Sequence, residues 1–155
     1  ISLYENFNTN PGKTEYAKFL ITLNETDNLD TIINYLSNNY DALSKIDDQQ
    51  TLETLAVLVN FLKLDLNPAE KFIYKKIIDE RTMPSYFLIM DIKKNIDSQN
   101  DLSLFMLSLI SINNKKWKDI HPEHLHVILN SINLYNQGSI IKPIILEILN
   151  ELEIF

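Results

Sequence analysis

The sequence predicts an all-α fold of about eight or nine short antiparallel helices, arranged as an irregular α-solenoid or a multi-helix bundle. The first observation is that apolar residues recur at helical spacing along almost the whole chain. The second is that only two of the 155 residues, Gly12 and Gly138, are glycine. Because glycine supplies the positive-φ positions of tight hairpins, this scarcity argues against a sheet. The connections are also short, which forces neighbouring helices to lie antiparallel.

The N-terminal residues predict a leader segment followed by a capped helix. Residues 1–10 are polar apart from a few aliphatic and aromatic side chains, through which we expect them to pack on the domain. A helix is expected to begin at Asn10-Pro11, because asparagine caps a helix and proline is favoured at its first position. Its apolar stripe is formed by Tyr16, Phe19, Leu20 and Leu23.

A second helix is expected to begin at Asp27, whose carboxylate can cap it. The pair Asn38-Asn39 is expected to end this helix, and residues 40–46 then add a short helical turn. Both assignments rest on the preference of asparagine and aspartate for helix ends over helix interiors.

Asp48 opens the next predicted helix, and residues 52–62 are apolar over more than one face. A helix with this pattern is usually central in a domain. The run from Asn67 to Glu70 combines a cap, a proline and a third-position acid, so it predicts another helix start.

Met83-Pro84 marks the start of a further helix that continues to Ile96. The segment 102–112 partly alternates between apolar and polar residues, a pattern that a strand would also show. We predict a helix here because the segment is long for a strand and its neighbours are helical.

The C-terminal third predicts a polar loop over residues 113–119 and two helices. His121-Pro122 opens the first helix, a turn containing Gly138 follows it, and Ser139 caps the last helix, which extends to Leu152. This arrangement over 102–152 resembles the C-terminal helical part of uncharacterised exported proteins of alphaproteobacteria. The resemblance implies no activity, and it favours the periplasm or another part of the bacterial envelope over the cytoplasm.

Length and composition favour one helical domain spanning residues 1–155. No fixed repeat period of the tetratricopeptide or HEAT type is visible. The first residue is Ile1, so we expect the chain to be a fragment of a longer one. Frequent Ile, Leu, Asn and Lys beside scarce Arg, Gly and Ala are typical of an AT-rich genome.

The charge and residue usage of the chain exclude several function classes. The net charge is −7 and Arg81 is the only arginine, which argues against nucleic acid and anionic membranes as partners. The chain has no cysteine, and therefore no disulfide or thiolate chemistry. No apolar run is long enough for a transmembrane segment. No glycine-rich phosphate loop or serine-hydrolase elbow is present, so we expect no cofactor and no enzymatic activity.

The three histidines, His121, His124 and His126, are candidates for metal binding. His121 and His124 are three residues apart and can share one helical face, whereas His126 lies about 200° away from His124. The alternative interpretation is a proline-started helix whose polar residues are structural. We predict no metal site, with His121 and His124 as the pair that would form one.

The predicted contact surface centres on Trp117, which lies among Lys115, Lys116 and Lys118. A tryptophan between lysines can stack on a base or a sugar, or it can fold back and fill a gap between helices. Tyr135 is expected to contribute to the same surface, because tyrosine favours interfaces. Most other aromatic residues, among them Tyr86 and Phe87, are expected in the core.

The leading hypothesis from sequence is a non-catalytic protein-interaction or scaffold domain. It rests on the helical-hairpin architecture and on the lack of a coherent catalytic set. The competing hypothesis is a helical accessory domain of a larger bacterial envelope enzyme. A third hypothesis is a small-ligand binder that uses Trp117 and the patch from His121 to His126.

Overall fold

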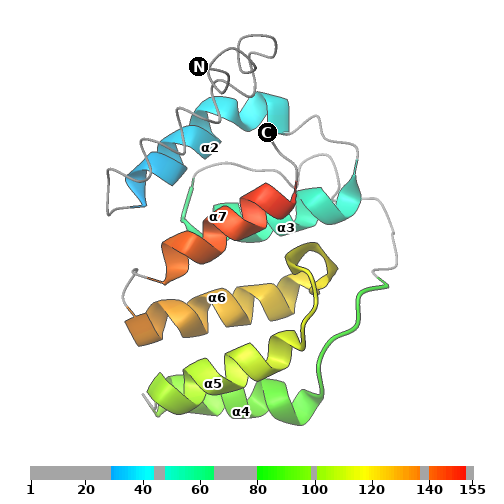
Figure 1. Ribbon diagram of the computed structural model, residues 1–155, viewed down its shortest axis with the longest axis vertical. Coiled ribbons are helices and arrows are strands. Elements are labelled where there is room, and N and C mark those ends of the chain that lie inside the picture. The colour runs from blue at the N-terminus through cyan, green and yellow to red at the C-terminus, as the bar shows by residue number, and fades with distance from the viewer. Residues whose placement is uncertain (1–28, 44–47, 65–79, 99–100, 137–139, 153–155) are drawn as a thin grey trace, which may run out of the picture.

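The computed structural model describes residues 29–43, 48–64, 80–98, 101–136 and 140–152 (Figure 1). Within these ranges the chain is helical and contains no strand, which confirms the all-α prediction. The elements are α2 (Asp30–Leu43), α3 (Gln49–Phe61), α4 (Tyr86–Asp97), α5 (Asp101–Ile112), the 3-10 helix η2 (Trp117–Asp119), α6 (Pro122–Asn136) and α7 (Ile141–Glu151).

The described ranges hold six α-helices, fewer than the eight or nine expected. The helix starts predicted at Asn10 and Asn67, the leader over residues 1–10 and the turn at Gly138 all lie outside the described residues. The short helical turn expected after Asn39 is not a separate element, because α2 continues through it to Leu43. This continuity accounts for part of the difference in number.

The prediction that Asn38-Asn39 ends a helix is wrong, because α2 runs through both residues. The Asn39 side-chain amide donates to the carbonyl oxygen of Tyr35 at 2.9 Å, one turn back along the helix. Asparagine in a helix interior costs less than about 1 kcal/mol, and burial of apolar residues can outweigh that cost. Leu43, which follows the asparagines, is buried, so its burial favours continuation of the helix.

Helix α3 begins and ends with well-formed caps. The Asp48 carboxylate accepts a hydrogen bond from the Thr51 backbone N–H at 3.1 Å, as predicted, and another from the Thr51 hydroxyl. The hydroxyl bond is the main reason why the pKa of Asp48 lies below its ordinary value. At the other end Lys63 has a φ of 56°. Its N–H donates to Asn60 and the N–H of Leu64 donates to Val59, which is a Schellman motif formed without glycine.

Replacing Asp48 with alanine should lower the free energy of unfolding by about 1 kcal/mol, because the first turn of α3 loses its side-chain acceptor. Asp48→Asn keeps a capping oxygen and should retain most of that stability. Urea titrations of the two variants and the wild type measure the difference. Equal losses in both variants would show that charge, rather than capping geometry, accounts for the contribution of Asp48.

Residues 101–112 form helix α5, so the strand alternative for this segment is wrong. The alternation arises from serines whose hydroxyl groups donate to backbone carbonyl oxygens of the same helix. Ser108 donates to the Leu104 carbonyl at 2.8 Å, and Ser111 donates to the Ser108 carbonyl at 2.6 Å. After the helix, Asn113 and Asn114 adopt positive φ angles of 50° and 58°. Asparagine tolerates this region better than most residues do, so the chain turns here without glycine.

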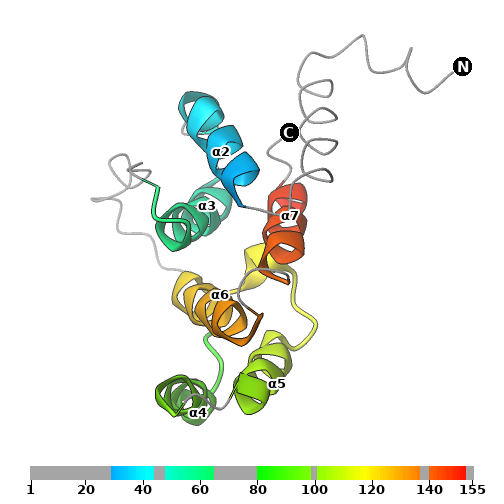
Figure 2. The ribbon, with the colours of Figure 1, turned by 90° about the vertical axis from the view of Figure 1, so that its left-hand side faces the viewer.

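The helices are arranged in successive layers, with α6 near the centre and the α4–α5 pair at one end (Figures 1 and 2). Helix α6 contacts α3, α4, α5 and α7. Helix α3, which follows Asp48, contributes seven buried residues, so it also lies within the core. Four apolar side chains of α6 are fully buried in the core, namely Leu125, Ile128, Leu129 and Ile132.

Helix α7 covers the opposite side of α6 from the α4–α5 pair (Figure 2). Its first residue is Ile141, and Ile140 occupies the cap position without a side-chain hydrogen bond. The cap predicted at Ser139 lies outside the described residues. Ile141, Ile145 and Ile148 are buried and give α7 its core-facing stripe. Every helix in the described ranges is too short or too polar to span a lipid bilayer.

Candidate functional site

The lysine-rich loop that follows α5 is folded onto the domain. Trp117 is only 8% exposed and belongs to the hydrophobic core. Lys115 donates from its ammonium group to the Thr82 hydroxyl at 2.8 Å, while Lys116 is exposed and Lys118 is half-buried. Of the predicted contact residues, Tyr135 has a side chain outside the described part of the structure. The structure thus separates Trp117 from the exposed Lys116 instead of presenting them on one surface.

Two carboxylates fix this loop from different helices. The Glu151 oxygens accept from the backbone N–H groups of Trp117 and Lys118, both at 3.0 Å, so the C-terminal end of α7 caps η2. Arg81 forms an ion pair with Glu53 of α3 and donates from Nη1 to the Lys118 carbonyl at 3.3 Å. The only arginine of the chain is therefore buried and joins α3 to η2. Sequence reasoning missed both contacts, because residues 28 to 37 positions apart carry no local signal of pairing.

The three histidines have three different environments. The His121 Nδ1 accepts from the Glu123 backbone N–H at 3.3 Å and caps α6. The His124 side chain is buried, and its Nε2 lies 2.8 Å from the Ser111 hydroxyl of α5. His126 Nε2 lies 3.0 Å from the side-chain amide of Asn130 on the same helix. No group of three or more metal-ligating side chains occurs among the described residues.

The hydrogen bonds of the Ser111 hydroxyl determine which ring nitrogen of His124 carries the hydrogen. Because this hydroxyl donates to the Ser108 carbonyl, its oxygen accepts the Nε2–H of His124. The other ring nitrogen, Nδ1, is then an unprotonated acceptor, and it is buried with no hydrogen-bond partner. Burial, with smaller contributions from Lys115 and His121, lowers the pKa of His124 to about 4. The ring is therefore neutral at physiological pH and joins α5 to α6.

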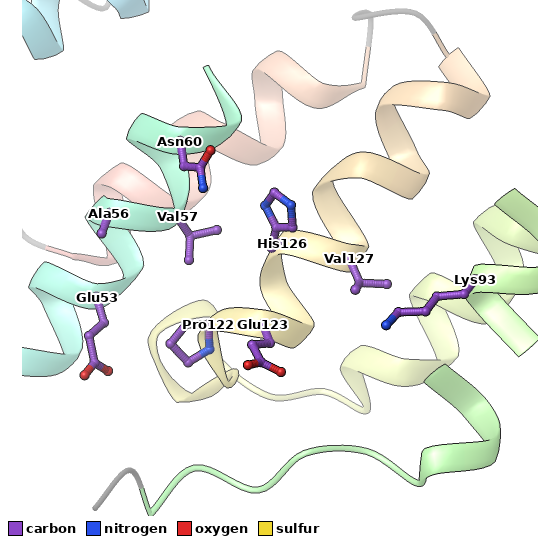
Figure 3. Close-up of a pocket in the computed structure, with 9 residues that line it drawn as sticks. All are labelled: Glu53, Ala56, Val57, Asn60, Lys93, Pro122, Glu123, His126 and Val127. Carbon is purple, nitrogen blue, oxygen red and sulfur yellow. The ribbon is translucent and has the colours of Figure 1, made fainter. Parts of the chain in front are cut away.

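An open groove of about 580 Å³ lies between α3, α4 and α6 (Figure 3). Small apolar side chains line it from α3 and α6, and Lys93 reaches toward α6 from α4. Glu53 and Glu123 both line the groove, but Glu53 already pairs with Arg81 and accepts from Gln49 at 2.7 Å. His126 faces the same groove. The polar side chains thus carry mixed charge, and the groove brings only His126 of the sequence candidates to its lining.

A set of seven exposed apolar side chains lies on α4 and α5. We call it the α4–α5 apolar face. Its members, with the exposed fraction of each residue, are Tyr86 (71%), Phe87 (79%), Met90 (44%), Leu102 (63%), Met106 (49%), Leu109 (44%) and Ile110 (61%). On α5 these residues lie opposite the buried Leu104 and Ser108. On α4, Phe87 and Met90 lie opposite the buried Ile92, whereas Tyr86 lies one turn before the buried Ile89.

The expectation that Tyr86 and Phe87 belong to the core is wrong. Their rings form an edge-to-face pair with centroids 6.2 Å apart, and both are exposed to solvent. Helical spacing alone could not reveal this, because α4 has apolar residues on both sides and only one side faces α6. The surplus of apolar residues over what one helix face can bury was the available signal.

Comparison with known protein families, characterised proteins and solved structures finds no match to this chain. The resemblance of residues 102–152 to exported bacterial proteins stays a prediction.

Proposed function

We propose that this chain is a non-catalytic protein-interaction or scaffold domain that binds a partner protein through the α4–α5 apolar face. The main support for this proposal is the area of apolar surface that the face exposes. Side chains of this size expose on the order of 200 Å² each when free, so the seven exposed fractions correspond to roughly 800 Å² of surface. The largest apolar patch of a typical monomer covers about 300–600 Å², and larger patches mark interaction sites.

The layered architecture adds a second argument. We infer that the layers form an irregular α-solenoid in which α4 and α5 are the terminal layer (Figure 2). In such arrays the outer face of a terminal layer is polar, because it has no further layer to cover it. Here the outer face carries Phe87 and Ile110, each more than half exposed. An apolar outer face fits a layer that another polypeptide covers.

Site-specific photocrosslinking in cells that naturally produce the protein tests this function. A photoreactive phenylalanine analogue in place of Phe87 or Leu109 should give discrete adducts with protein on irradiation. The matched control is the same analogue at Glu147, an exposed position on α7. We expect no discrete adduct from Glu147, because it lies on a different helix from the apolar face.

Equal adduct patterns from Phe87 and Glu147, or no adduct from either Phe87 or Leu109, would contradict the proposed function. An adduct formed only within one longer polypeptide would replace it with the accessory-domain hypothesis.

A further inference from the structure

We propose that the partner on the α4–α5 apolar face is a second copy of this chain, and that α5 of one protomer crosses α5 of the other at a two-fold axis near Met106. This inference rests on the proposed function and names the occupant of the same surface. The pattern of side chains on α5, its charge and the size of the face each support it.

The exposed residues of α5 form a ridge that suits symmetric packing. Leu102, Met106 and Ile110 are spaced by four residues, so they line up along one row of the helix surface, with Leu109 beside them. When the four-residue ridges of two helices interdigitate, the helices cross at about −50°, the most common class of helix packing. In a two-fold interface the same surface is used twice, and this packing class uses the same ridge on both helices.

Met106 is the middle residue of the ridge, and a two-fold axis through the centre of the ridge brings its two copies together. Methionine is flexible and polarisable, so two methionines can adapt to each other at such a contact.

The charge distribution permits a second copy to approach at this end of the molecule. The chain carries a net charge of −7, which opposes self-association in general. Helix α5, however, has Asp101 as its only ionisable residue. In α4 two lysines, Lys93 and Lys94, balance the two aspartates. Most of the negative charge therefore lies away from the proposed contact.

The size of the face agrees with what a stable dimer needs. A standard protein interface buries about 800 Å² on each partner, and the α4–α5 apolar face exposes a similar area. Aromatic and methionine side chains are enriched in the cores of such interfaces, and Tyr86, Phe87, Met90 and Met106 belong to these types.

Sedimentation equilibrium of the purified chain, over about 1–200 μM, tests the proposal, because a standard-size interface commonly gives micromolar or tighter affinity. We expect a species of twice the 18.1 kDa chain mass at the upper concentrations. Met106→Glu places two carboxylates against each other at the axis and should raise the dissociation constant of the dimer by at least about 100-fold. Leu134→Glu is the matched control, since Leu134 is a half-exposed apolar residue on α6 and should leave the dimer intact.

A disulfide test locates the axis independently of affinity. The chain has no cysteine, so Met106→Cys introduces a single thiol. Mild oxidation should then give a covalent dimer of Met106→Cys but not of Leu134→Cys, because only residues near a two-fold axis lie within disulfide reach of their own copies. Circular dichroism of each variant confirms that the fold is kept.

A wild-type chain that stays monomeric across the concentration range overturns the dimer, as does a dimer that Met106→Glu does not weaken. A covalent dimer from Leu134→Cys but not from Met106→Cys places the axis elsewhere and also overturns the proposal. A monomer that still gives crosslinked adducts with another protein from Phe87 would retain the interaction function and reject only the second copy as occupant.

Discussion

Replacing Trp117 with alanine is expected to lower the free energy of unfolding by about 3–5 kcal/mol, as is typical of large aromatic side chains removed from a core. The indole is 8% exposed and packs in the core together with Ile120 at the end of η2. A domain of this kind has a total stability of about 5–15 kcal/mol, so the loss would remove a large part of it. The only tryptophan of the chain therefore acts as a structural residue.

The cost should be at the upper end because the loop cannot collapse into the vacated space. The backbone N–H of Trp117 is held by Glu151, and the carbonyl of Lys118 is held by Arg81. A cavity that its surroundings cannot fill costs more than one that they can. Urea unfolding followed by far-ultraviolet circular dichroism measures the loss, since the variant has no tryptophan to report by fluorescence.

Lys116→Ala is the control for this experiment, because Lys116 is exposed in the same loop. Exposed substitutions usually change stability by less than about 0.5 kcal/mol. If Trp117→Ala were as mild as Lys116→Ala, the indole would not fill the core, and the sequence hypothesis of an exposed tryptophan contact would regain support.

The sequence predicts local features of this fold well, because their causes are local. The cap at Asp48 and the start of α6 after His121 depend on hydrogen bonds within three residues, and both are present. The helix at 102–112 follows from its length and its surroundings. The central position of α6 could not be predicted in the same way, since it depends on which helices meet α6 in space.

The candidate surface was harder to predict than the helices. Charged and aromatic residues alternate around Trp117, which predicts a contact surface, but long-range contacts with Glu151 and Thr82 fold that loop back onto the domain. Helical spacing predicts a core position for Phe87, since apolar residues at such spacing are usually buried. Which side of an apolar helix stays exposed is decided by the packing of its neighbours, and periodicity within the helix does not contain that information.

Acidification should destabilise the protein through His124 before most carboxylates titrate. In the unfolded chain this histidine takes up a proton near pH 6.5, whereas in the folded chain it does so only near pH 4. Between these two pH values the unfolded state binds more protons than the folded state, so the unfolded fraction increases as the pH falls. The stabilising effect of a neutral His124 is fully present above pH 6.5 and is lost progressively toward pH 4. One pKa unit corresponds to about 1.4 kcal/mol, so the total loss is about 3 kcal/mol.

The physical cause lies in the α5–α6 interface. The Nδ1 of His124 has no partner among the described residues, so a proton added there would place a buried charge without an acceptor. The nearby Lys115 and His121 further disfavour a positive ring. Asp48, whose pKa is lowered by its bond from Thr51, weakens the fold only at more acidic pH.

Urea unfolding followed by Trp117 fluorescence, at several pH values from about 7.5 to about 4, measures this dependence. His124→Leu removes the titrating ring and keeps an apolar side chain between α5 and α6, so its stability should vary much less over the same pH range. His126→Leu is the matched control, because it removes a histidine from the same helix that is only half-buried and lines the groove. An unchanged pH dependence in His124→Leu would assign the acid sensitivity to other groups, and the neutral histidine between α5 and α6 would then have no part in it.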